Sequence, residues 1–168
     1  LTDRLEEWAR HAPERVQGIA MLCTAPFADS EAAAQKRLAA LDAVAQGRYF
    51  ELVAAAVANT FHPDSLANAP LMAARQAMVQ DYGPARYAAH VRATAARPDR
   101  SALLDGSRPT LVLAGSHDKL FTPEALAAYA ARIPGAQQRV VGPAGHLAPM
   151  EQPRAVAEAL AQWMGAAA

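Results

Sequence analysis

Short apolar segments predict three strands, and each is followed by a loop and then by a helical pattern. The strands are expected at residues 16–23, 110–114 and 138–141. The first two are almost continuously apolar, which is typical of parallel strands that are buried on both faces. Helices are expected from residue 2 to just before Pro13, over residues 122–133 and over residues 153–164. This alternation predicts an α/β fold built on a parallel sheet.

Between the first and second expected strands the pattern is helix after helix. Breaks are expected at Gly47, at His62-Pro63-Asp64, at Asn68-Ala69-Pro70 and at Gly83-Pro84. We therefore expect a sheet core formed by residues 1–29 and 98–168, and an all-helical cap, or lid, formed by residues 30–97. The large side chains of this insertion favour helix packing, with a substrate-facing wall as the alternative: Tyr49, Phe50, Phe61, Leu71, Met72, Met78 and Tyr82.

Three strands make a thin parallel sheet, because such sheets are normally covered on both faces and extended sideways. The first strand, residues 16–23, is therefore expected to have an uncovered edge. Unpaired backbone in an apolar strand is a template for association. We expect this edge to pair with a second copy of the chain or with a missing N-terminal half of the fold.

Composition narrows the class of protein without identifying its chemistry. The 168 residues suit one folded domain, and the hydrophobic share of 52% excludes intrinsic disorder. Sixteen basic and sixteen acidic residues, with no run of like charges, argue against nucleic-acid binding. A single cysteine, Cys23, excludes an internal disulfide or a paired-cysteine zinc site and favours a reducing compartment. No apolar run is long enough to indicate a membrane partner.

Two candidate catalytic side chains follow the second and third strands. Asp118 lies in the loop after residues 110–114, and His146 lies in the glycine-containing loop after residues 138–141. The carboxyl ends of parallel strands meet at one edge of a sheet, so these side chains are expected to be neighbours. A carboxylate that accepts from one imidazole nitrogen leaves the other nitrogen to take a proton from a nucleophile. A turn-forming aspartate and a polar loop histidine are the alternatives.

The same loops resemble those of a known family. Gly-Ser-His-Asp-Lys-Leu-Phe-Thr-Pro (115–123) and Gly-Pro-Ala-Gly-His-Leu-Ala-Pro-Met-Glu-Gln-Pro (142–153) resemble the acid and histidine loops of the α/β-hydrolase family. Residues 9–16 resemble the segment after that family's nucleophile, and Arg97-Pro98-Asp99 resembles the return from its helical cap. The resemblance implies a partial α/β-hydrolase fold, with three parallel strands equivalent to strands six to eight, flanking helices and an all-helical cap insertion.

The nucleophile of that family is a serine in a Gly-x-Ser-x-Gly elbow, and this chain has no such motif. On the family pattern the elbow would fall just before Leu1 or over residues 1–4, so we expect the serine to lie outside the chain. The serines present lie in turns or lid loops: Ser30, Ser65, Ser101, Ser107 and Ser116. Cys23 is a candidate thiol nucleophile, although a small apolar residue at a strand end is the favoured interpretation.

Asp29 is a possible alternative acid, because some members of the family place a carboxylate after the sixth strand. Its other interpretation is a cap, together with Ser30, for the helix that follows.

The resemblance implies a cytoplasmic bacterial enzyme similar to enol-lactone hydrolases or short-chain carboxylesterases, with no metal or cofactor. It would hydrolyse a small apolar ester or lactone, with His146 as general base and then acid and Asp118 as its orienting partner. The chain alone is expected to be inactive. The alternative is a truncated or degenerate hydrolase that acts as a non-catalytic binding or interaction module. A dinucleotide-binding domain is disfavoured, because no Gly-x-Gly-x-x-Gly follows a strand.

Overall fold

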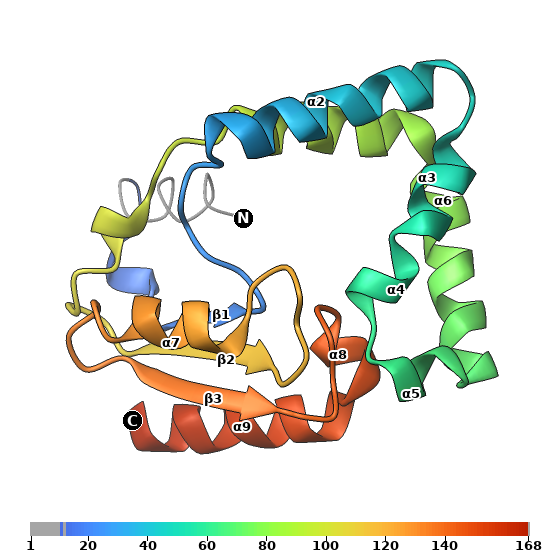
Figure 1. Ribbon diagram of the computed structural model, residues 1–168. Coiled ribbons are helices and arrows are strands. Elements are labelled where there is room, and N and C mark those ends of the chain that lie inside the picture. Colours follow the sequence, from blue (N-terminus) through green and yellow to red (C-terminus); the bar gives the residue numbers. More distant parts are fainter. Residues whose placement is uncertain (1–10, 12, 168) are drawn as a thin grey trace.

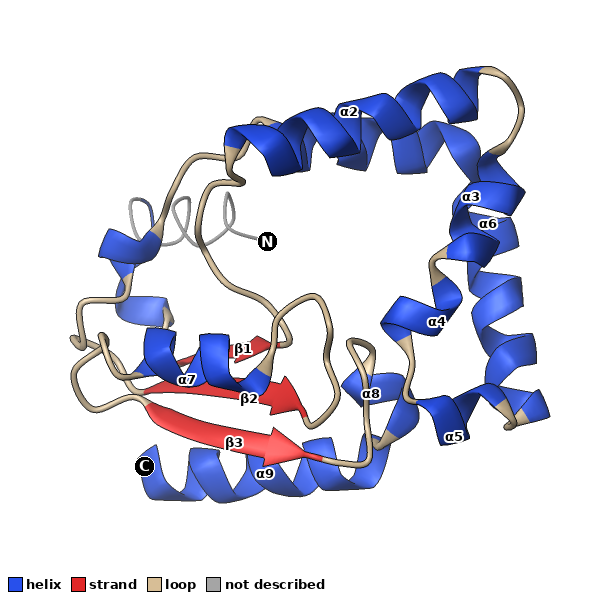
Figure 2. Ribbon diagram, viewed as in Figure 1, coloured by secondary structure: helices blue, strands red, loops and turns tan. Residues whose placement is uncertain are grey.

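A three-stranded parallel sheet forms the base of the structure, a computed structural model that describes residue 11 and residues 13–167 (Figures 1 and 2). Its strands, in spatial order, are β1 (Ile19–Leu22), β2 (Thr110–Gly115) and β3 (Gln137–Val141). Ile19 pairs with Thr110, and Leu111 pairs with Gln137. The prediction of three parallel strands is confirmed. Of the helix expected from residue 2 to just before Pro13, only residue 11 is described, and it is helical.

β1 is shorter and less buried than its apolar sequence predicts. The strand covers four residues rather than eight, and only Met21 in it is buried. Within the described part of the chain β1 pairs with β2 alone, so its second edge has no strand beside it. Both faces of β1 are nevertheless covered in part, because Ile19 and Met21 pack in one apolar cluster and Leu22 packs against the other. The expectation of a strand fully buried on both faces is therefore met only in part.

One helix covers each face of the sheet: α7 (Pro123–Ala130) and α9 (Pro153–Ala167) lie on opposite sides in Figure 1. The fully buried strand β2 alternates between the two faces. Val112 and Ala114 pack in one apolar cluster with Leu126 of α7, and Leu113 packs in a second cluster with Val156 of α9. Burial of a side chain such as Leu113 contributes roughly 1.5–3 kcal/mol to folding.

The insertion between β1 and β2 is helical throughout its described length. Its helices are α2 (Glu31–Ala45), α3 (Tyr49–Ala55), α4 (Val57–Thr60), α5 (Pro63–Leu66) and α6 (Ala69–Ala95). α2 runs alongside α6, away from the sheet (Figure 1). The expected break at Gly83-Pro84 takes the form of a kink within α6, where Gly83 has a φ of 69°.

Polar side chains begin three of the helices. Ser30, Asn68 and Thr122 accept hydrogen bonds of 3.1–3.2 Å from the amides three residues later, at the starts of α2, α6 and α7. Three short helical turns complete the chain: η1 (Pro13–Arg15), η2 (Ser101–Leu103) and α8 (Ala148–Glu151). Across residue 11 and residues 13–167, no helix has the length and apolar character that crossing a membrane requires.

Candidate active site

The structure brings Asp118 and His146 together at the carboxyl edge of the sheet. Nδ1 of His146 lies 3.0 Å from Oδ2 of Asp118. Their loops follow β2 and β3, which are adjacent and parallel, so both loops leave the sheet at the same edge. The predicted proximity of the two side chains is therefore met, at hydrogen-bond distance.

Asp118 is held as a buried, ionised acceptor. Its Oδ1 accepts hydrogen bonds from the backbone amides of Leu120, at 2.8 Å, and Phe121, at 2.9 Å. Burial alone would raise the pKa of Asp118, but the hydrogen bonds from His146 and the two amides outweigh it and lower the pKa below its usual value. An ionised Asp118 accepts from an Nδ1–H of His146, which leaves Nε2 unprotonated and able to take a proton.

Gly115 allows the acid loop and the histidine loop to touch through their backbones. A Cβ on Gly115 would lie 2.0 Å from the carbonyl oxygen of Gly145, far inside contact distance. The amide of His117 donates to the carbonyl of Ala144 at 2.8 Å, and the amide of Ser116 donates to the carbonyl of Val141 at 2.8 Å. This backbone packing fixes the separation of Asp118 and His146.

The helical insertion also binds directly to the histidine loop. The amide of His146 donates to the carbonyl of Thr60 at 2.8 Å. The carboxylate of Glu151 accepts from the amide of Gly145 at 2.8 Å and from the amide of His62 at 2.8 Å. No local sequence pattern indicates that Glu151 is a site residue, because its partner His62 lies in the distant insertion.

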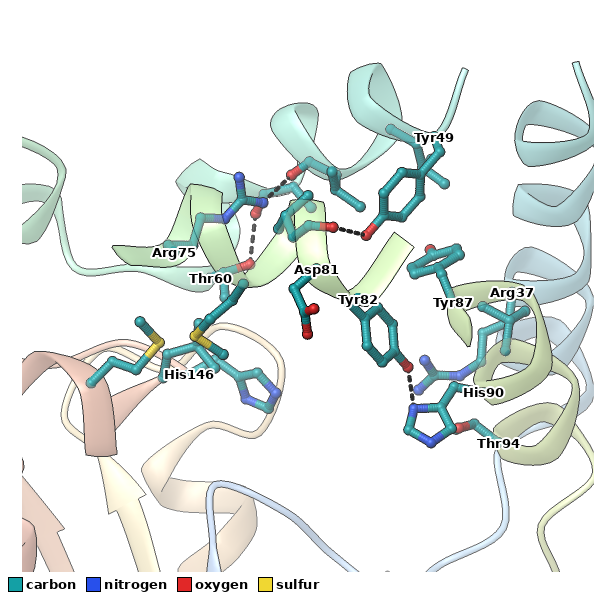
Figure 3. Close-up of a pocket in the computed structure, with 18 residues that line it drawn as sticks. Arg37, Tyr49, Thr60, Arg75, Asp81, Tyr82, Tyr87, His90, Thr94 and His146 are labelled. Carbon is teal, nitrogen blue, oxygen red and sulfur yellow. Dashed lines mark hydrogen bonds between the residues drawn. The ribbon is translucent and has the colours of Figure 1, made fainter. Parts of the chain in front are cut away.

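A cavity of about 840 Å³ lies between the insertion and the histidine loop. His146 lines it, and the His146 side chain is 25% exposed (Figure 3). The apolar part of the wall comes from both sides of the cavity: Leu52, Val53, Met78, Val79, Val91, Leu147 and Met150. This size and lining suit a small organic molecule.

The large side chains expected to pack the insertion divide between the core and the cavity. Phe61 is fully buried, and Tyr49 is buried but also lines the cavity, together with Met78 and Tyr82. Phe50 is 51% exposed, so it neither packs in the core nor lines the cavity. Helix packing and the cavity wall therefore each account for some of these residues, and Tyr49 belongs to both.

Asp29 does not cap the helix after it; Ser30 alone does. The Asp29 carboxylate instead accepts from Arg97 at 3.0 Å and from Arg37, and only 5% of its side chain is exposed. Both of its oxygens are thus bound by arginines. The expected capping role of Asp29 was wrong, since its partners come from distant parts of the insertion.

Cys23 has the features of a packed thiol rather than of a nucleophile. It is 3% exposed, and burial, followed by the nearby charge of Asp118, raises its pKa to about 11. The thiol is therefore protonated near neutral pH, and only the thiolate reacts as a nucleophile.

None of the five serines in the described part of the chain hydrogen-bonds to His146, and Ser116 contacts His117 instead, at 2.8 Å. In the same residues no group of three or more histidine, cysteine or acidic side chains is arranged to hold a metal ion.

Comparison with known proteins agrees with this fold. Residues 7–153 match the family model described as alpha/beta hydrolase fold. A thermophilic esterase from Thermogutta terrifontis is 31% identical, with a TM-score of 0.86 over 95% of this chain and 60% of that protein. No match was found among curated proteins.

Two further solved structures share the fold. A hydrolase from Pseudomonas aeruginosa PA01 is 28% identical, with a TM-score of 0.80 over 98% of this chain and 61% of that protein. An enol-lactonase from Burkholderia xenovorans LB400 is 24% identical, with a TM-score of 0.76 over 96% of this chain and 60% of that protein. The chain thus spans about 60% of the length of these similar proteins.

Proposed function

Because the chain belongs to the α/β-hydrolase fold family, we propose that it supplies the acid and the histidine of a hydrolase that cleaves a small ester or lactone. The observation that carries this proposal is the 3.0 Å contact between Asp118 and His146 at the wall of the cavity. Esterase and enol-lactonase activities are those named for two of the similar structures. Residues 30–97 act as the lid of this cavity, and residues 1–29 and 98–168 form the core that carries the two loops.

In the proposed reaction His146 takes the hydroxyl proton of a serine as that serine attacks the ester carbonyl. The imidazolium that forms is stabilised by ionised Asp118, and it then protonates the leaving alkoxide. Water later attacks the acyl-serine, with His146 again taking and returning the proton. No cofactor is needed for these steps.

We place the nucleophilic serine outside this chain. The sequence contains no Gly-x-Ser-x-Gly, and the described serines make no contact with His146. The free edge of β1 is the proposed docking position for the part of the fold that carries this serine or for a second copy of the chain. A cytoplasmic location is part of the proposal, supported by the single buried thiol.

The test begins with the gene upstream of Leu1, read in frame for a Gly-x-Ser-x-Gly. The longer protein is then assayed on short p-nitrophenyl esters beside its His146→Ala variant. We expect turnover to fall by several orders of magnitude in the variant, with folding unchanged. Equal turnover in both proteins would overturn the mechanism, and a longer protein without hydrolysis would favour a degenerate binding module.

A further inference from the structure

A phenylalanine of the acid loop lies against the imidazole of the proposed general base. The ring centroids of Phe121 and His146 are 5.9 Å apart, and the two ring planes are 20° from parallel. Aromatic rings prefer such offset, stacked contacts at centroid distances of roughly 4.5–7 Å. We propose that Phe121 is a positioning residue that holds the imidazole plane of His146 in its reactive orientation. This inference rests on the proposed ester hydrolysis and names a further residue that serves it.

The hydrogen bond to Asp118 does not by itself fix the imidazole of His146. Nδ1 lies 3.0 Å from Oδ2 of Asp118, so this contact holds one atom of the ring. The ring can still tilt about that atom, and a tilt moves Nε2, which takes the serine proton in the proposed reaction. The His146 side chain is 25% exposed, so its surroundings do not enclose it fully. A contact along the ring plane restricts the tilt, and Phe121 supplies one.

The Phe121 side chain is itself held by the core. It is partly buried and packs against the apolar cluster that contains Leu126. Phe121 directly precedes Thr122, the residue that caps α7, and Leu126 is the fourth residue of that helix. Apolar residues at these two positions form a hydrophobic staple, which fixes how the chain enters a helix. The Phe121 ring is therefore a firm support for the imidazole.

The backbone of Phe121 binds the acid, so one residue contacts both members of the pair. Its amide donates to Oδ1 of Asp118 at 2.9 Å, while Oδ2 is the oxygen next to His146. A substitution at position 121 retains this amide and changes only the ring. The contribution of the ring can therefore be measured while Asp118 keeps its hydrogen bond.

Phe27 provides a matched control. It is also partly buried and packs against the same apolar cluster as Phe121. Its ring contacts Tyr129, at 4.7 Å between centroids, and the guanidinium of Arg132. Phe27→Leu and Phe121→Leu thus remove the same ring from the same cluster, and we expect similar losses of stability. We expect only Phe121→Leu to change the behaviour of His146.

The first measurement needs no turnover. Nuclear magnetic resonance of the 168-residue chain detects the Nδ1–H of His146 that donates to Asp118, and an Overhauser effect between the rings of Phe121 and His146 is expected. In Phe121→Leu this Nδ1–H should exchange with water about tenfold faster, because the freed ring breaks its hydrogen bond more often. In Phe27→Leu the exchange rate should stay within about twofold of the wild-type rate.

The second measurement uses the longer protein that we propose to carry the serine. Phe121→Leu should lower kcat about tenfold and leave KM within about twofold, since Phe121 does not line the cavity. Phe121→Tyr retains the six-membered ring and should keep at least about half of the wild-type kcat. Phe27→Leu should leave both constants within about twofold.

Equal exchange rates in Phe121→Leu and Phe27→Leu would overturn the inference. If Phe121→Leu does not fold, the Overhauser effect in the wild-type chain and the kcat of Phe121→Tyr decide, and absence of the first or a tenfold loss in the second would overturn it. Faster exchange in Phe121→Leu, without hydrolysis by the longer protein, would reject only the proposed function. Hydrolysis that depends on His146 but is unchanged in Phe121→Leu would reject only the role of Phe121.

Discussion

Glu151 accepts a 2.8 Å hydrogen bond from the backbone amide of His62, which lies 89 positions earlier in the sequence. Its other carboxylate oxygen accepts from the amide of Gly145, next to His146. One side chain therefore joins the lid to the loop that carries the proposed general base. The position of His146 relative to the cavity depends on this bridge.

Removal of the Glu151 carboxylate should lower both stability and catalysis, although Glu151 does not take part in the proposed reaction. Glu151→Ala leaves two amides without their acceptor, and we expect the free energy of unfolding to fall by about 2 kcal/mol. In the longer protein that we propose to carry the serine, kcat should fall about a hundredfold with a small change in KM, since His146 is displaced while the cavity remains.

Glu151→Gln separates positioning from stability. Its amide oxygen can still accept from one of the two amides, so we expect partial rescue of both kcat and stability. Urea unfolding and steady-state kinetics on the same samples make the comparison. If Glu151→Ala lowers stability but leaves kcat unchanged, the residue has no positioning role.

Asp118→Asn should lower kcat by about four orders of magnitude in the longer protein, because an asparagine no longer selects the histidine tautomer with Nε2 free. Ester hydrolysis under substrate saturation measures this loss. Asp42→Asn, an exposed change on α2, is the control and should have no effect. A greater loss in Asp29→Asn than in Asp118→Asn would transfer the role of the acid to Asp29.

Asp118 also predicts a pH dependence of stability. Its pKa is lower in the folded chain than in the unfolded chain, so the unfolded state binds the proton first as pH falls. The stabilisation by Asp118 is complete above the unfolded pKa of about 4 and is lost as pH falls through the lower folded value. The difference in free energy of unfolding between the wild-type chain and Asp118→Asn should therefore shrink below about pH 4 in urea titrations. A difference that is constant with pH would contradict this assignment.

The contact between the two loops depends on the absence of a side chain at Gly115. Gly115→Ala would force its methyl group against the Gly145 carbonyl, and we expect the free energy of unfolding to fall by about 3 kcal/mol. Gly165→Ala in α9 meets no atom within 4 Å and should stabilise the helix by up to about 1 kcal/mol. Thermal unfolding distinguishes the two variants, and equal effects would show that the loops can separate freely.

The acid and histidine loops could be located from the sequence because each directly follows a strand. Strand direction then places Asp118 and His146 at one edge without knowledge of the side-chain packing. The hydrogen bonds between His62 and Glu151 and between Arg97 and Asp29 could not be predicted in this way. They join residues that are distant in the sequence, and their formation depends on how the insertion packs.

At β1 the apolar composition predicts more burial than the structure shows. Its apolar residues predict burial on two faces, but burial depends on which elements lie beside a strand as well as on the strand's own composition. Only Met21 is buried there. Ser30, by contrast, was predicted as a helix cap and is one, since capping depends only on the residues that follow it.

The kink at Gly83 can change which ligands the cavity prefers without any change in the residues that line it. Gly83 does not line the cavity, but it lies in the sequence between Tyr82 and His90, which do. Its φ of 69° sets how the two halves of α6 are oriented relative to each other. A side chain at this φ is strained even though the space beside Gly83 is open. Ligand preference can therefore evolve through backbone geometry at one position, with each side chain that touches the ligand unchanged. Ester selectivity of the longer protein, measured with and without Gly83→Ala, would reveal such a change.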